Sequence, residues 1–204
     1  MHRLDFLLPG GMRAKGPRFQ SALPTDPALW SLPTGRSMRA RVRSFAPIIG
    51  DDPRLLVLGS MPGVASLDAH RYYAHPRNLF WPIVGTLLGF DPVLPYDARI
   101  AHVRARGIAL WDVAGECVRP GSLDARIDAG SVVPNDIRGL LARHPGITRI
   151  RFNGAAAESL FRRHVLPALE TPLDLLRLPS TSPAHAALGF EGKLAAWREG
   201  FAGV

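Results

Sequence analysis

Short apolar runs recur along the chain from residue 54 onward, and polar or turn-forming residues separate them. Each run has the length of a buried strand and is too short for a typical helix. The runs are LLVLGS (55–60), IALWDV (108–113), ITRIRFN (147–153) and LDLLRLPS (173–180). This pattern predicts four strands that are buried on both faces.

Amphipathic segments follow these runs, with apolar residues three and four positions apart, as on one face of a helix. Pro134 suits the first turn of a helix, and Gly107 suits a helix end. The predicted helices cover residues 78–90, 97–106, 134–144, 155–169 and 193–201. The alternation predicts an α/β fold, a three-layer α/β/α sandwich around a central four-stranded parallel sheet.

The first 44 residues differ from the rest, because prolines and glycines are frequent and no helical or strand period persists. This predicts a poorly structured basic arm over residues 1–44, ahead of a folded domain over residues 45–204. Met38 is an alternative start of the protein. The arm carries a basic run that is either a solvated tail or a phosphate contact, namely Arg36, Arg39, Arg41 and Arg43.

The charge balance fits a polyanionic partner. The formal net charge is +8, from 25 Lys and Arg against 17 Asp and Glu, and such an excess is typical of nucleic-acid-binding proteins. Nearly all of it is arginine, since Lys15 and Lys193 are the only lysines in the sequence. A bias in genomic composition explains the arginine content equally well.

Composition also excludes several classes of protein. The single cysteine, Cys117, allows neither an internal disulfide nor an iron–sulfur cluster held by four thiolates of this chain. The histidines are scattered, so we expect no metal and no other cofactor. No apolar run approaches the ~18 residues of a membrane helix, and Pro9 and Gly10 break the short apolar start too early for a secretory signal. We expect a cytoplasmic monomer without membrane association.

Polar residues gather where the predicted strands end, which is where ligands bind in parallel sheets. In the turn GSMPG (59–63), two glycines allow close approach of the backbone to a ligand, although such a turn alone is more often structural. Tyr72 and Tyr73 offer flat faces that could stack on a base or simply pack in the core. Asn78 begins an apolar helix after Pro76, so it is also a candidate N-cap.

Together these blocks resemble the uracil-DNA glycosylase superfamily, and most of all its hypoxanthine-DNA glycosylase branch (family 6, the DNA-deoxyinosine glycosylases). The resemblance covers about residues 45–200 and runs through GSMPG…SL…YYAHPRNLFW, GIALWDV…GSLD, FNG and PSTSPAH. A shorter form of the first block also occurs in the mismatch-specific uracil glycosylases. The resemblance implies a monofunctional DNA glycosylase of base-excision repair. Its substrates would be deaminated bases, with hypoxanthine preferred over uracil or xanthine.

The resemblance also implies roles for individual residues. Asn78 would position the nucleophilic water, and Tyr73 would stack on the extruded base. Met61 stands where the mismatch-specific enzymes hold an asparagine, and a thioether cannot orient water. Asp112 would contact the base or organise water, unless it is only a cap. The remaining predicted base-binding residues are Gly59, Ser60, Met61, Phe80 and Asn153, although Phe80 also fits a core position and Asn153 a strand end.

The last block would contact the DNA backbone, and Ala184 and His185 lie where the family places its wedge loop. Thr181 offers a further hydroxyl for phosphate. His185 could equally be an ordinary surface histidine. The predicted DNA-binding residues are Gly63, Ser66, His75, Ser180, Ser182, Ala184 and His185.

The lysines bear on whether the enzyme also cuts the DNA backbone. Glycosylases that do so use an amine as nucleophile. Lys15 and Lys193 lie away from the strand-end motifs in sequence, which predicts a monofunctional enzyme.

Two alternative functions remain. Ser60, Asp112 and His185 follow the chain order of a serine hydrolase, but the nucleophile elbow would need glycines at positions 58 and 62. A nucleic-acid-binding module without catalysis is the other alternative, and base release distinguishes it from an enzyme.

Overall fold

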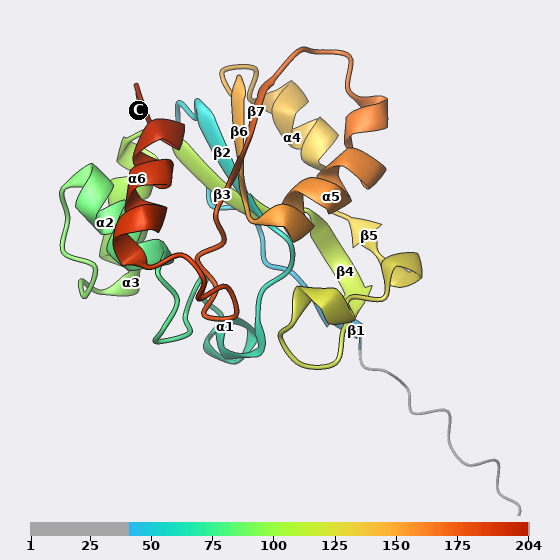
Figure 1. Ribbon diagram of the computed structural model, residues 1–204. Helices are drawn as coiled ribbons and strands as arrows, with labels where there is room; N and C mark the ends of the chain where they lie inside the picture. Colours follow the sequence, from blue (N-terminus) through green and yellow to red (C-terminus); the bar gives the residue numbers. More distant parts are fainter. Residues whose placement is uncertain (1–40, 204) are drawn as a thin grey trace, which may run out of the picture. The chain divides into compact units, whose positions relative to one another are not determined.

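The structure is a computed structural model that describes residues 41–203. A parallel four-stranded sheet lies between two layers of helices (Figure 1). Across the sheet the strands are β3 (Ile108–Asp112), β2 (Leu55–Gly59), β6 (Arg149–Asn153) and β7 (Asp174–Leu178). The predicted three-layer α/β/α sandwich is confirmed, and each predicted strand is present within its predicted run. The expected burial on both faces is wrong for β7 at the sheet edge, where Asp174, Leu176 and Arg177 are exposed.

The central strands are apolar because they are covered on both faces. Every residue of β2 and β3 is buried, as expected for parallel strands between helical layers. The two strands pair in register from Leu55 opposite Ile108 to Gly59 opposite Asp112. Their carboxyl ends therefore coincide, and the residues after each strand meet at one edge of the sheet.

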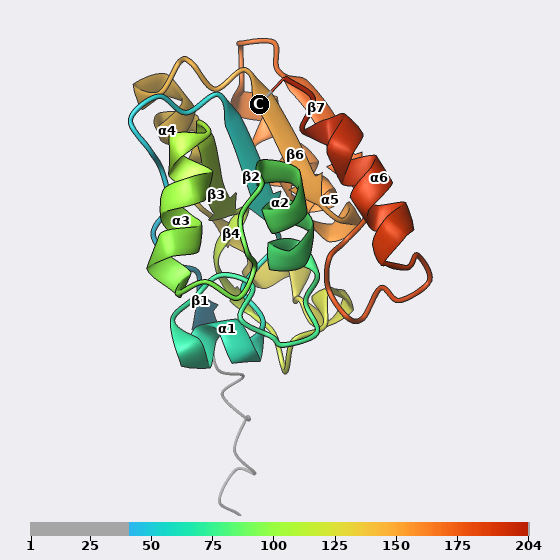
Figure 2. The same ribbon diagram turned by 90° about the vertical axis from the view of Figure 1, so that its left-hand side faces the viewer.

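Helices α2 (Phe80–Leu88), α3 (Tyr96–Ala105) and α6 (Phe190–Gly200) cover one face of the sheet, and α4 (Ile137–Arg143) and α5 (Ala155–His164) cover the other (Figure 2). All five helices were predicted, with boundaries shifted by a few residues. The largest shift is at the end of α5, which stops at His164 and is followed by a 3-10 turn. Helix α4 begins later than predicted, because Pro134 belongs to a strand and Asp136 caps the helix by accepting from Gly139 N.

A small antiparallel sheet was not predicted. It has the order β1 (Arg41–Arg43), β4 (Ala114–Val118), β5 (Val133–Pro134), and Glu116 of β4 forms ion pairs with both arginines of β1. The expectation of a loose arm up to residue 44 is therefore wrong for its last four residues. The predictions that concern Lys15, Arg36, Met38 and Arg39 lie outside the described residues.

Short elements complete the fold. Helix α1 (Val64–Ala69) follows the first strand-end turn, and 3-10 turns cover Asp124–Arg126, Ala129–Ser131 and Leu166–Ala168. The core between the sheet and α2 and α6 contains large aromatic side chains, among them the fully buried Phe80 and Trp197. Within residues 41–203, no helix has the length and apolar character that crossing a bilayer requires.

Candidate active site

A cavity of about 480 Å³ opens at the carboxyl ends of the parallel strands. It draws its walls from the segments after β2, β3, β6 and β7 and from the loop that precedes α2. The predicted site residues that line it are Gly59, Ser60, Met61, Gly63, Ser66, Tyr73, His75, Asn78, Asp112, Asn153, Ser180, Ser182, Ala184 and His185. The fold thus gathers these residues around one space.

Tyr73 lines the cavity and rests on Phe80. The two rings are stacked, with centroids 3.8 Å apart and an interplanar angle of 16°. Phe80 is 0% exposed and does not line the cavity, so the predicted contact between Phe80 and a base is wrong. Tyr73 also has a φ of 56°, a strained value for a residue with a side chain. The stacking contact with Phe80 fixes the orientation of the Tyr73 ring.

Asn78 is a residue of the cavity wall and lies one position before Leu79, the N-cap of α2, so the N-cap alternative is wrong. Its side-chain Oδ1 accepts a hydrogen bond of 3.0 Å from Phe80 N at the start of α2, which satisfies one of the free N–H groups of the helix terminus. The next backbone N–H, of Leu79, donates to Thr181 O at 3.0 Å. The first residue of α2 therefore orients the Asn78 side chain, and the start of α2 is bonded to the loop after β7.

Asp112 is a buried carboxyl group at the end of β3, with 3% exposure. Its Oδ2 accepts a hydrogen bond of 2.8 Å from Ser44 Oγ. Burial raises the pKa of Asp112 to about 7, the hydrogen bond from Ser44 opposes that shift, and the charge of Asp124 adds to it. Near neutral pH, Asp112 is therefore present in both its acid and its ionised form.

Asn153 joins two strand ends. Its Nδ2 donates to Thr181 Oγ1 at 2.9 Å, and its Oδ1 accepts from Thr181 N at 2.8 Å. Both ends of the amide are thus used to hold the loop after β7 against β6. Thr181 is fully buried, so its hydroxyl is not a surface contact for phosphate.

The loop of residues 119–125 forms a wall to which the sequence analysis assigned no function. Arg119 is buried and donates to the backbone carbonyls of Met61 and Pro62. Ser60 Oγ donates to Asp124 Oδ1 at 2.7 Å. Ser60 is thus paired with a carboxylate of this loop, and no hydrogen bond to His185 is found in the described part of the chain, which argues against a serine hydrolase.

Lys193 lies against the loop after β7, although the sequence analysis placed it away from the strand-end motifs. Its side chain is 2% exposed, and its Nζ donates to His185 O at 2.7 Å. Burial lowers the pKa of Lys193. The side chain supports this loop from behind and does not line the cavity. Across residues 41–203, no three His, Cys, Asp or Glu side chains are grouped so that they could hold a metal ion.

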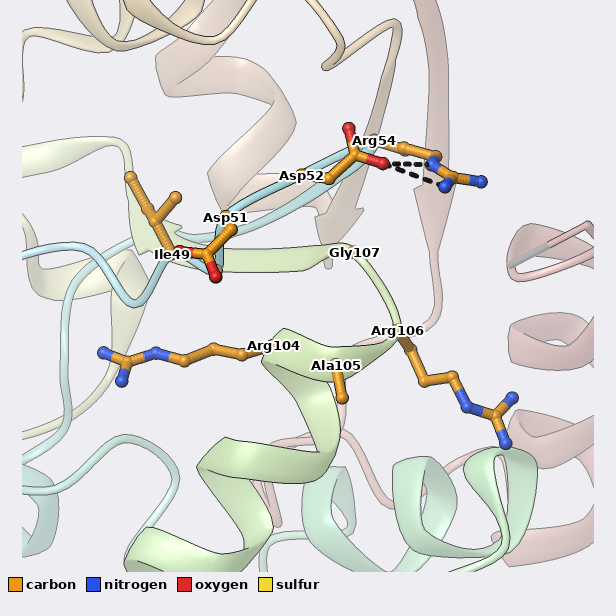
Figure 3. Close-up of a pocket in the computed structure, with 9 residues that line it drawn as sticks. Ile49, Asp51, Asp52, Arg54, Arg104, Ala105, Arg106 and Gly107 are labelled. Atoms are coloured by element: carbon orange, nitrogen blue, oxygen red, sulfur yellow. Dashed lines mark hydrogen bonds and ion pairs between the residues drawn. The ribbon is translucent and has the colours of Figure 1, made fainter.

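A second pocket, of about 590 Å³, lies at the opposite, amino-terminal edge of the sheet (Figure 3). Its walls come from the segments that precede β2 and β3, and they include Asp51, Asp52, Arg54, Arg104 and Arg106. Asp52 and Arg54 form an exposed ion pair at 2.9 Å. None of the predicted site residues lines this pocket.

Comparison with known proteins gives consistent relatives, although no family model matches the chain. Proteins named hypoxanthine DNA glycosylase from Methanosarcina barkeri and Methanosarcina acetivorans are each 34% identical, over 113 and 116 residues. The matches cover 55% and 56% of this chain and 70% and 72% of the relatives. A solution NMR structure from M. acetivorans, provisionally assigned as a uracil DNA glycosylase, is 29% identical with a TM-score of 0.64. That match covers 79% of this chain and 99% of the other.

Proposed function

The chain belongs to the hypoxanthine DNA glycosylase family of the uracil-DNA glycosylase superfamily, and from this premise we propose that it is a monofunctional DNA glycosylase. It hydrolyses the N-glycosidic bond of deaminated bases in base-excision repair, with hypoxanthine preferred and uracil and xanthine as further substrates. The observation that carries this proposal is that Tyr73, Asn78 and Asp112 line one cavity at the carboxyl edge of the sheet. The partner is DNA, and the enzyme acts as a cytoplasmic monomer.

The chemistry needs a positioned water and an environment that excludes bulk solvent. Breaking the bond creates positive charge on the sugar and negative charge on the base. Asn78 positions the water, because its side-chain carbonyl keeps a second lone pair after accepting from Phe80 N. That same hydrogen bond fixes the plane of the amide. The water is thereby oriented toward the sugar before the base departs.

Tyr73 provides the stacking surface for the extruded base. Extruding a nucleotide costs a few kcal/mol, and stacking on an aromatic side chain returns ~1–3 kcal/mol. Phe80 supports the far face of the Tyr73 ring at 3.8 Å. Little ordering of the ring is then required when the base arrives.

Asp112 acts on the base in its acid form. A neutral carboxyl group can donate a hydrogen bond to the departing base, whereas an ionised one would repel the negative charge that develops there. The pKa of about 7 keeps enough of the acid form near neutral pH. Ser44 fixes the second oxygen of the carboxyl group.

The position of the one described lysine supports the proposal that the enzyme does not cut the strand. Lys193 is the one lysine within residues 41–203, and its Nζ is directed to His185 O behind the cavity wall. A Schiff base with the sugar would require that amine to enter the cavity. The product is therefore an intact strand with an abasic site.

One experiment tests the proposal directly. Oligonucleotides that contain inosine, uracil or xanthine are incubated with the protein, as single strands and paired with each base, and the released base is quantified. Release of hypoxanthine at the highest rate, without strand cleavage before heating in alkali, is expected. Tight binding to inosine-containing DNA without any base release would instead identify a binding module.

A further inference from the structure

One lip of the cavity carries a bulky apolar side chain that is held away from the core. Leu123 lines the cavity and is 49% exposed. A leucine this exposed lacks most of the stabilisation that burial of its side chain would give. Single exposed leucines are common on protein surfaces. What distinguishes Leu123 is the rigid loop that holds it.

The loop of residues 119–125 is fixed on both sides of Leu123. Immediately before it, Ser122 Oγ accepts from Val64 N at 2.9 Å, and immediately after it, Asp124 accepts from Ser60 Oγ at 2.7 Å. Arg119 adds a third connection through the carbonyls of Met61 and Pro62. Leu123 is thus held out toward solvent by a loop that cannot easily bend away.

Burying the charged side chain of Arg119 costs free energy, which indicates that the position of this loop matters. The guanidinium group is buried, and all its hydrogen bonds go to backbone carbonyls, since no ion pair with a carboxylate is formed within residues 41–203. Removing a charge from water without an opposite charge is unfavourable. A loop that needed only to close a surface would not require such a connection.

The opposite lip lacks an equivalent side chain. Among the residues that line the cavity there, Ala184 and His185 occupy the place where the family resemblance predicts the wedge, and neither is a large apolar residue. Leu188 of the same loop is 43% exposed but is directed to α6. A methyl group added to Gly192 would come within 2.6 Å of Leu188 Cδ1. The large aliphatic side chain at the cavity mouth is therefore Leu123.

We propose that Leu123 is inserted into the duplex beside the extruded nucleotide and fills the space that the base has left. The proposal rests on the proposed function, because it requires duplex DNA over the cavity. Apolar side chains inserted between base steps stabilise unstacked DNA, and insertion buries the apolar surface that Leu123 exposes in the free protein. The fixed loop prevents the side chain from being pushed aside.

The test compares Leu123→Ala with Leu188→Ala, a leucine of similar exposure on the opposite loop. Single-turnover release of hypoxanthine is measured from duplex and from single-stranded DNA. Loss of the inserted side chain should slow release from the duplex about tenfold, equivalent to one factor of ten in the extrusion equilibrium. Release from the single strand, where no pairing opposes extrusion, should change less than about twofold.

A second readout does not depend on catalysis. A 2-aminopurine placed next to a non-hydrolysable 2′-fluoro-deoxyinosine in the duplex reports unstacking by increased fluorescence. The wild type and Leu188→Ala should give the increase, and Leu123→Ala should lose most of it. Because this signal needs no bond cleavage, it decides the role of Leu123 even if the wild type releases no base, which would refute the proposed function separately.

Several outcomes would overturn the proposal. An equal loss on single-stranded and duplex DNA would make Leu123 a pocket wall rather than a wedge. An unchanged rate and fluorescence in Leu123→Ala, the absence of a fluorescence increase with the wild type, or an equal duplex-specific loss in Leu188→Ala would each refute it. Both substituted side chains are partly exposed, and thermal unfolding of each variant verifies that folding is retained.

Discussion

The two edges of the parallel sheet present two pockets of similar size and very different construction. The pocket at the amino edge has a volume of about 590 Å³ and the cavity at the carboxyl edge one of about 480 Å³. The charged side chains of the amino-edge pocket are exposed, as in the Asp52–Arg54 pair. At the carboxyl edge, Asp112, Thr181 and Arg119 are buried and bonded to distant parts of the chain. Buried polar groups that bond to distant parts of the chain therefore distinguish the carboxyl edge from the amino edge, whereas pocket volume does not.

Removal of the amide at the carboxyl edge should have the largest effect. Asn78→Ala deletes the group that we propose positions water, and we expect release of hypoxanthine to fall about 100-fold or more, the scale of a positioned catalytic group. Single-turnover kinetics with an inosine duplex measure this rate. The lost hydrogen bond from Phe80 N should also cost about 1 kcal/mol of stability. A decrease of only a few-fold in a folded variant would reduce Asn78 to a structural contact at the start of α2.

Shortening Tyr73 should have the next largest effect. Tyr73→Ala removes the ring that we propose supports the extruded base, and a loss of ~1–3 kcal/mol of stacking corresponds to roughly 5- to 150-fold in the release rate. Tyr73→Phe keeps the ring and should retain activity within about threefold. If Tyr73→Phe is as inactive as Tyr73→Ala, the hydroxyl group acts in the reaction, and the stacking role is wrong.

The pH dependence isolates the buried acid. Because the pKa of Asp112 is raised to about 7, its acid form is lost above that pH, and release should fall about tenfold per pH unit in the alkaline range. Asp112→Asn keeps a hydrogen-bond donor and should flatten the profile. Rates measured from about pH 5 to about pH 9, roughly two units on each side of this pKa, test this prediction. A decline of the same shape in Asp112→Asn would exclude Asp112 as its origin.

The same group has a consequence for stability, with a definite sign. The folded-state pKa of Asp112 lies above the unfolded value of about 4, so the unfolded chain releases its proton first as the pH rises. The free energy of unfolding should therefore decrease from about pH 4 to pH 7 and change no further above that range through this group. In Asp112→Asn this contribution disappears, which thermal unfolding at several pH values can show.

Changes at the amino edge should have the smallest effect and serve as the matched control. Arg104→Ala and Asp52→Asn alter the amino-edge pocket (Figure 3), and neither residue lines the cavity at the carboxyl edge. Release of hypoxanthine should change less than about twofold, and an exposed ion pair such as Asp52–Arg54 contributes at most about 1 kcal/mol. A tenfold loss of activity in either folded variant would contradict the contrast between the two edges.

The sequence was most informative where interactions are local or periodic. The apolar runs predicted the parallel strands, and the order of motifs at their ends predicted the residues that share the cavity. Phe80 was misassigned because an aromatic residue beside a site can contact either the ligand or the residue that does. In the structure it stacks behind Tyr73.

The missed features depend on contacts between residues that are far apart in the chain. Ser44 lies 68 positions from Asp112, and Arg119 lies 58 positions from Met61. No spacing or composition in the sequence encodes these pairings, because they follow from how the strands and helices are arranged in space.

The clamp made by Arg119 has a consequence for protein engineering. Residues 59–64 and 119–125 form one hydrogen-bonded unit, because each segment supplies groups that pair with the other. A chimera that takes only one of these segments from a relative would leave the buried guanidinium of Arg119, or the carbonyls of Met61 and Pro62, without hydrogen-bond partners. Efforts to broaden the range of excised lesions should therefore exchange both segments together.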